Sequence, residues 1–178
     1  MSLDISLATV ADFSDDERTE LQQLGDAVYP PEVRAGMPGM KREWSYATWG
    51  IRGRLDGQLV AYVGTITRNV TLDGRSLTIG GIGGVKTHPD FRRKGYAGQC
   101  LDAANEFFDD QGVEFALLVC LPHLIEYYGK FGYNPFNGTM HVTQFGEPEV
   151  FSFNQPLVRS VRIEAPTDGE LNLHGAPW

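Results

Sequence analysis

The order of apolar and polar positions predicts a strand and then a helix at the start of the chain. Leu3–Ala8 alternates apolar and polar residues, which is typical of a strand with one buried face. Ser14 and Glu17 form a capping box at the start of a helix, and the prolines after Tyr29 end it. The stretch 30–43 mixes Pro, Gly, Met and charge without a period. We interpret it as a loop with one helical turn, long enough to be a lid or a substrate loop.

Three β-rich stretches follow this loop, and hairpin signals divide them. The stretches cover 44–54, 59–72 and 77–87, and the hairpin signals between them are Asp56-Gly57 and Asp73-Gly74. The third stretch is interrupted by Gly80-Gly81 and Gly83-Gly84. Pairs of glycine inside a strand indicate a bulge, or a close approach by another backbone or by a ligand.

The second half of the chain predicts a helix, a buried strand and a β-rich end. An apolar stripe at helical spacing covers about 95–111, and Gly112 suits the position after the helix. Residues 115–121 are nearly all apolar, as in a strand buried on both faces. A short helix is predicted to Phe131, then β structure over 133–163 and an irregular end over 164–178. Without repeats or linkers, residues 1–178 predict a single α+β domain.

Charge is distributed unevenly along the chain. Residues 1–94 hold 12 acids and 12 bases, whereas residues 95–178 hold 11 acids and 3 bases, so the second part carries the whole net charge of −8. A chain without a broad basic surface is a poor ligand for nucleic acid and for anionic membranes. We therefore expect neither as a partner, and the surplus of acids is compatible with a cationic small molecule.

Other features indicate a cytoplasmic protein without a metal. Cys100 and Cys120 form no CxxC motif or disulfide framework and are expected to be free thiols in a reducing compartment. The start of the sequence lacks the pattern of a signal peptide, and no run approaches 18 apolar residues. No cluster of His, Cys and carboxylates has the spacing of metal ligands. The β-rich end is compatible with pairing of two chains.

A basic, glycine-containing turn that leads into a helix predicts an anion site. The first N–H groups of a helix have no internal partner, and the helix dipole favours negative charge beside them. The residues concerned are Arg92, Arg93, Lys94, Gly95, Tyr96, Ala97 and Gly98. The GxGxxG and Walker patterns fail, because Lys86 occupies the third glycine position of the first and Val85 separates Gly84 from Lys86-Thr87. The turn is therefore predicted to bind a pyrophosphate of another kind.

Two motifs in this region resemble those of the GCN5-related N-acetyltransferase (GNAT) superfamily. They are Val85-x-Thr87-x-Pro89-x-Phe91-Arg92-x-Lys94-Gly95-x-Ala97 and Tyr127-Tyr128-Gly129-Lys130-Phe131-Gly132-Tyr133, with strand, loop, helix, strand and helix in order around and between them. The resemblance covers residues 79–136. It implies a central mixed, mostly antiparallel sheet that splays open between two strands, with flanking helices.

The resemblance also implies a reaction, namely transfer of acetyl from acetyl-CoA to a primary amine by direct attack. Backbone groups of the segment Val85, Lys86 and Thr87 would pair with the pantetheine, and the 92–98 turn would hold the pyrophosphate. Tyr128 stands at the position of the general acid that protonates the leaving thiolate. Two alternatives stay open: transfer of a longer acyl group from CoA or a carrier protein, and a non-catalytic CoA-binding sensor.

A narrower likeness concerns the acceptor. Trp44, the spacing Arg68-x₅-Gly74-x₂-Leu77-x₂-Gly80 and Trp178 resemble the layout of aminoglycoside 2′-N-acetyltransferases and of nodulation N-acyltransferases. This implies that the carboxylate of Trp178 reaches the acceptor. Gly83 and Ala176 stand where the aminoglycoside enzymes carry acids, which argues against aminoglycosides. His123 is a candidate base beside the acceptor, with water as the alternative, and Cys120 is a candidate for an acyl-cysteine relay.

Overall fold

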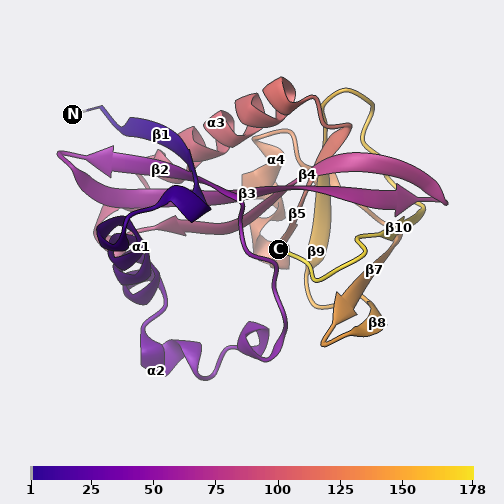
Figure 1. The fold of residues 1–178 in the computed structure, drawn as a ribbon, viewed down its shortest axis with the longest axis horizontal. Helices are drawn as coiled ribbons and strands as arrows, with labels where there is room; N and C mark the ends of the chain where they lie inside the picture. Colours follow the sequence, from indigo (N-terminus) through magenta and orange to yellow (C-terminus); the bar gives the residue numbers. More distant parts are fainter. Residues whose placement is uncertain (1) are drawn as a thin grey trace.

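The chain forms one ten-stranded sheet with helices against both faces in the computed structural model, which describes residues 2–178 (Figure 1). The strands are β1 (Asp4–Thr9), β2 (Trp49–Leu55), β3 (Gln58–Leu72), β4 (Arg75–Thr87), β5 (Phe115–Cys120), β6 (Asn134–Pro135), β7 (Thr139–Gln144), β8 (Glu147–Val150), β9 (Gln155–Ser160) and β10 (Glu170–Asn172). The helices are α1 (Asp15–Val28), α2 (Pro31–Arg34), α3 (Tyr96–Gln111) and α4 (Ile125–Gly129). Single 3₁₀ turns occupy Val10–Asp12, Pro38–Lys41, Pro89–Phe91 and Pro122–Leu124.

The sheet is mixed and mostly antiparallel, as the family resemblance implies. Its order is β6-β9-β5-β4-β3-β10-β7-β8, and β2 and β1 continue it beside the first part of β3. Only β4 with β5 and β7 with β10 run parallel among the strand pairs of residues 2–178. The long β3 therefore carries β4 along one edge, and both β2 and β10 along the other.

Local signals in the sequence place several element boundaries correctly. Ser14 and Glu17 make both hydrogen bonds of a capping box at the start of α1. Asp56-Gly57 and Asp73-Gly74 have positive φ at both positions, which is the backbone of a type I′ turn between antiparallel strands. Gly112 takes the left-handed conformation that ends α3.

Three predicted segments differ from the structure. Residues 44–48 precede β2 instead of belonging to it, because the N–H of Ser45 donates to Pro177 at 2.6 Å and not to a ladder partner. The stretch 30–43 holds two short turns, α2 and Pro38–Lys41, where one was expected. The end over 164–178 is not wholly irregular, since β10 forms between β3 and β7. The first and third differences depend on partners far away in the sequence, whereas local hydrogen bonds form the two turns of 30–43.

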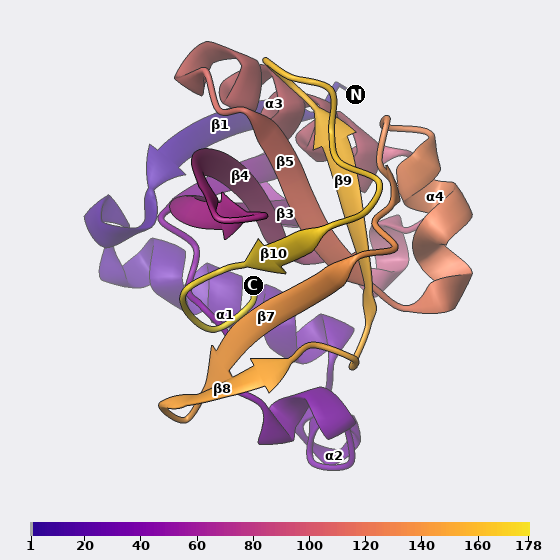
Figure 2. The ribbon, with the colours of Figure 1, turned by 90° about the vertical axis from the view of Figure 1, so that its right-hand side faces the viewer.

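The two faces of the sheet are covered differently. Helix α3 packs on one face against a cluster that includes Ala61, Val63 and Ile82. Helix α1 packs on the opposite face, where Leu24 and Tyr62 belong to one buried cluster, and β10 and β7 extend the same sheet beside the second part of β3 (Figures 1 and 2). Within the described residues, none of these helices combines the length and apolarity that crossing a membrane requires.

Candidate functional site

The sheet opens between β4 and β5. The two strands pair only where Gly80, Gly81 and Ile82 face residues 116–118. β4 then continues to Thr87 along β3, and β5 continues to Cys120 along β9, so the facing edges of the two strands are unpaired beyond this point. A free strand edge offers N–H and C=O groups to any chain-like ligand that lies in the gap.

A β-bulge lies in β4 beside this opening. Gly64 pairs with Gly83 and Tyr62 pairs with Lys86, so β4 has one extra residue between two pairs that lie two residues apart on β3. Gly84 has a φ of +61° and takes the conformation that the bulge needs. Because directly opposed residues share a face, Gly83 and Lys86 point to the same face of the sheet.

The glycine pairs of β4 allow close contacts, as the sequence predicts. A Cβ atom at Gly80 would lie 2.5 Å from the ring of Phe108, and one at Gly81 would lie 2.2 Å from the ring of Trp178. At Gly83 a Cβ atom would lie 3.0 Å from the main-chain carbonyl carbon of Trp178. Any side chain at these positions would displace α3 or Trp178.

Trp178 is anchored at the opening. Its side chain is buried, and the indole N–H donates to the carbonyl of Leu117 on β5 at 3.1 Å. The guanidinium of Arg68 lies 4.9 Å from the ring and donates to the carbonyl of Ala176 at 2.7 Å. Ser45 donates through its hydroxyl to the same carbonyl. The last residues of the sequence are thus fixed beside Gly81 and Gly83.

The 92–98 turn has the free donors of an anion site. Gly95 precedes α3 with a φ of +80°, and Arg93 has a φ of +63°. Within residues 2–178, the N–H groups of residues 93–98 donate to no protein acceptor. Residues 92–95 are exposed, including their three basic side chains. Donors and charges of this kind fit a phosphate.

Gly98 has a different reason for being small. It is buried, and a Cβ atom there would lie 3.0 Å from the ring of Phe131. Tyr96 packs partly against the core on the same side of the sheet. The open approach to the helix end is therefore at Gly95, where a Cβ atom would meet nothing within 4 Å.

Tyr128 lies on α4 next to the end of β5. Its side chain is buried, and its hydroxyl makes no hydrogen bond within residues 2–178. Burial raises the pKa of Tyr128, and the neighbouring Cys120, Tyr127 and Tyr29 raise it further. The phenol is therefore protonated at neutral pH and has a proton to donate.

Val85, Lys86 and Thr87 form the end of β4, but the Lys86 side chain does not lie with those of its neighbours. Val85 packs against the cluster on the α3 face. The Lys86 ammonium lies 5.3 Å from the ring of Tyr62, on the α1 face. The bulge causes this, since it shifts the alternation of faces by one residue. At the unpaired edge of β4, Lys86 can therefore contribute only its backbone groups, alongside the backbone groups of Val85 and Thr87.

The remaining candidate residues are either exposed, as His123 is, or buried, as the two cysteines are. His123 is exposed and has no hydrogen bond or ion pair within residues 2–178. Burial raises the pKa of the Cys120 thiol to about 11 and that of Cys100 to about 12, so neither is a ready nucleophile. Among the described residues, no group of three or more His, Cys, Asp or Glu side chains could hold a metal ion.

A family comparison identifies the chain. Residues 11–136 match the family model described as an acetyltransferase (GNAT) domain. The chain belongs to the GNAT family. The resemblance found in the two motifs is thereby confirmed at the level of this family, and the open β4–β5 edge and the 92–98 turn fall inside the matched residues. No curated protein sequence matches the chain.

Solved structures show that the whole fold is of the GNAT type. An acyl-CoA N-acyltransferase from Pseudomonas aeruginosa is 20% identical with a TM-score of 0.62, covering 89% of this chain and 100% of its own. A GNAT family N-acetyltransferase from Escherichia coli (YhbS), in complex with CoA, is 17% identical with a TM-score of 0.63, covering 98% and 92%. A GNAT family acetyltransferase from Brucella melitensis, in complex with acetyl-CoA, is 16% identical with a TM-score of 0.59, covering 96% of both.

The contacts of some residues around the opening could not be predicted from the sequence, although Arg68 belongs to the spacing that resembles aminoglycoside 2′-N-acetyltransferases. Ser45 and Arg68 hold the last residues of the sequence, although they lie over 100 positions away from them. Tyr29 and Arg34 line one pocket with Lys86 at the end of β4, and α1 is the helix that packs against this strand. The irregular composition of 30–43 is the one hint for Arg34, since such loops often border sites.

Proposed function

We propose that this GNAT protein is an acyl-CoA-dependent N-acyltransferase that transfers acetyl from acetyl-CoA to a primary amine. The observation that carries the proposal is the unpaired edge of β4 next to a turn with free N–H donors. A pantetheine arm has amides that suit such an edge, and a pyrophosphate suits such a turn. Similar proteins in complex with CoA and with acetyl-CoA support this choice of cosubstrate.

The reaction in this proposal is direct. The neutral amine attacks the thioester carbon, the carbon–sulfur bond breaks, and the amine loses a proton to water or to His123. A backbone N–H near Val85 polarises the thioester carbonyl. Tyr128 donates its proton to the departing sulfur.

Trp178 and Gly83 border the acceptor, which approaches from the α1 face of the sheet. Arg92, Arg93 and Lys94 contribute positive charge at the pyrophosphate, and the N–H groups from Gly95 through Tyr96 and Ala97 to Gly98 contribute donors.

The test has two parts on the purified protein. Calorimetric titration with acetyl-CoA is expected to show saturable binding, and free CoA release over a panel of primary amines is expected to exceed the rate without amine. Binding of acetyl-CoA without turnover on any amine would instead support a CoA sensor. A clear preference for octanoyl-CoA over acetyl-CoA would support transfer of a longer acyl group.

A further inference from the structure

A pocket between α1, α2 and the end of β4 carries more positive than negative charge. The cavity measures about 370 Å³, which is small for a ligand pocket. Three basic residues line it, namely Arg18, Arg34 and Lys86, and its one acidic lining residue in the described chain is Asp26. This local charge is opposite to the net charge of −8 of the chain.

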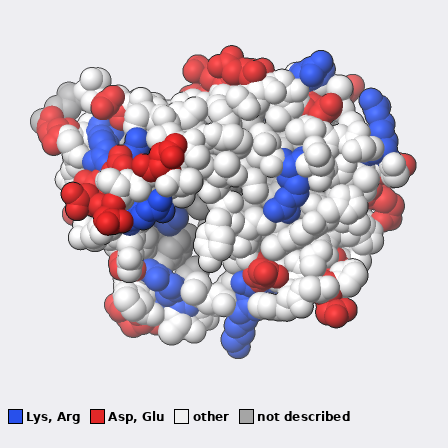
Figure 3. All heavy atoms as spheres, viewed as in Figure 1, with Lys and Arg blue, Asp and Glu red and all other residues white. Residues whose placement is uncertain are grey.

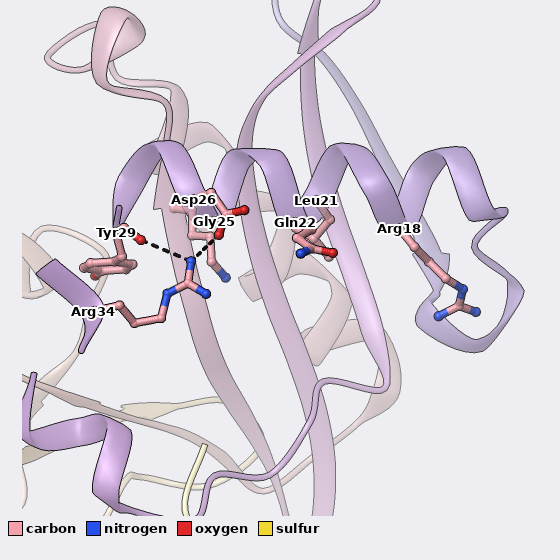
Figure 4. Close-up of a pocket in the computed structure, with 8 residues that line it drawn as sticks. Arg18, Leu21, Gln22, Gly25, Asp26, Tyr29 and Arg34 are labelled. Carbon is pink, nitrogen blue, oxygen red and sulfur yellow. Dashed lines mark hydrogen bonds and ion pairs between the residues drawn. The ribbon is translucent and has the colours of Figure 1, made fainter. Parts of the chain in front are cut away.

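Asp26 does not neutralise the whole pocket, because Arg34 already binds it. The two side chains form an ion pair, and Arg34 also donates to the carbonyl of Tyr29 at 3.1 Å (Figure 4). Arg18 lies at the other end of this face of α1 in the same view. One of its N–H groups donates to the carbonyl of Ala11. The charges of Arg18 and Lys86 are therefore left without a carboxylate in the pocket.

Of the three basic residues that line the pocket, Lys86 says most about the charge of a ligand that would fit there. Its ammonium donates to the carbonyl of Gly84 at 3.2 Å and lies over the ring of Tyr62, and it has no carboxylate partner within residues 2–178. Burial lowers the pKa of Lys86, and the nearby Arg34 lowers it further. Partly buried cations are usually paired with an anion, because an uncompensated charge is costly in a poorly solvated place.

The pocket lies beside the proposed site of transfer. Lys86 follows the bulge and shares a face of the sheet with Gly83, against which Trp178 packs. On its other side the pocket includes Tyr29, which is near enough to Tyr128 to raise its pKa. An acceptor with its amine at the opening between β4 and β5 has this pocket next to it.

We infer that the acceptor carries an anionic group, a carboxylate or a phosphate, and that this group binds in the α1–α2–β4 pocket against Lys86. The inference rests on the proposed function for the amine and adds the second functional group of the substrate. It replaces the expectation of a cationic acceptor, because the charges that line a site act on a ligand more strongly than the net charge of the chain. Arg34 and Arg18 would contribute further donors.

The pocket is tested first without catalysis. In ¹H–¹⁵N NMR titrations with sodium acetate and with inorganic phosphate, against sodium chloride at equal ionic strength, the amides of Gly25, Gly84 and Lys86 are expected to shift saturably. Lys86→Gln is expected to weaken this binding at least tenfold, since hydrogen bonds to charged groups are the strong ones. Arg75→Gln, an exposed change in the β3–β4 hairpin, is the matched control. Unsaturable shifts in the wild type, or equal binding in Lys86→Gln, would overturn the inference.

The acceptor is tested second, with pairs of amines that differ in charge. Glycine against glycinamide, and 2-aminoethyl phosphate against ethanolamine, separate a carboxylate from a phosphate. At least one anionic member is expected to exceed its neutral partner tenfold in kcat/KM, and Lys86→Gln is expected to remove that preference. Equal turnover of both members would overturn the inference and leave the proposed function standing. Absence of turnover with acetyl-CoA and every amine would count against the proposed function, while the anion titration still decides the pocket.

Discussion

Tyr128 has the properties of a proton donor held in a fixed place. Its hydroxyl has no protein partner within residues 2–178, and burial keeps it protonated well above its ordinary pKa of 10. A raised pKa means that the phenol is neutral throughout the pH range of an ordinary assay. The activity should therefore not fall between pH 7 and pH 9 through ionisation of Tyr128.

Tyr128→Phe is expected to lower kcat about 100-fold, the lower end of the effect of a general acid, while leaving the Kd for acetyl-CoA within about twofold. Steady-state kinetics and calorimetry measure the two quantities. Tyr127→Phe, on the same helix and in edge contact with Tyr128, is the matched control and should keep its rate. Equal losses of rate and affinity in Tyr128→Phe would contradict the role of acid.

Gly81 shows why a glycine in a strand can be informative without a turn. A Cβ atom there would overlap the ring of Trp178. Gly80 is restricted in the same way by Phe108 on α3. The sequence predicts a close approach at these glycines, but it does not say which element approaches, because the partner of Gly81 lies 97 positions further along the chain.

At the scale of elements, the end of α3 facing the 92–98 turn combines two independent features. The helix itself follows from its apolar stripe and from Gly112, so it could be predicted from the sequence. The exposed N–H groups follow from the left-handed Gly95, which precedes the helix without a side-chain cap. Both features are local, which is why the sequence was sufficient to place them.

Gly95→Glu is expected to weaken acetyl-CoA binding at least tenfold, since a carboxylate would compete with the pyrophosphate for the same donors. Calorimetric titration measures the change. Gly57→Glu is a matched control, because Gly57 has a φ of +85° and equally open surroundings, so the strain and the added charge are alike. If both variants bound acetyl-CoA alike, the assignment of the phosphate site would be wrong.

β4 is the element that the sequence describes only in part. Its extent follows from the pattern of residues, but the position of the extra residue in its bulge depends on pairing with β3. The bulge places Lys86 on the α1 face, whereas strict alternation from Gly83 would place it on the α3 face. The presence of Lys86 in the α1–α2–β4 pocket could therefore not be predicted from alternation alone.

At the scale of the whole molecule, Trp178 joins both sides of the opening. Its ring packs on Gly81 of β4, its N–H binds β5, and Arg68 of β3 holds the segment before it.

The surface around α1, β1 and β2 carries many charged side chains. There acidic and basic side chains lie side by side, and ion pairs join Arg52 to Glu17 and Arg54 to Glu20 (Figure 3).

Trp178→Ala is expected to lower the free energy of unfolding by about 3–5 kcal/mol, the usual cost of removing a buried Trp side chain. Trp178→Phe keeps the ring contact but leaves the Leu117 carbonyl without its donor, so a loss of about 1–3 kcal/mol is expected. Chemical denaturation measures both. Similar losses in the two variants would show that the hydrogen bond, and not packing, dominates.

Gly81→Ala provides a second test of the same contact. The added methyl group collides with Trp178 and, less severely, with Ile66 in the wild type, and the Trp178→Ala background removes the more severe of these two collisions. The double variant is therefore expected to be more stable than the sum of the two single losses predicts, by about 1 kcal/mol or more. Strict additivity would mean that the two residues do not touch in solution.

Most helices and strands, the hairpin turns, the family motifs and the turn with free N–H donors could be predicted from the sequence, because each depends on residues that are neighbours along the chain. The folded structure was needed to know which face Lys86 occupies, what packs on Gly81 and Gly83, and that β10 pairs between β3 and β7. These depend on contacts between segments up to about a hundred positions apart, and packing selects among them. The charge of the pocket belongs to this second group, since α1, α2 and β4 contribute it jointly.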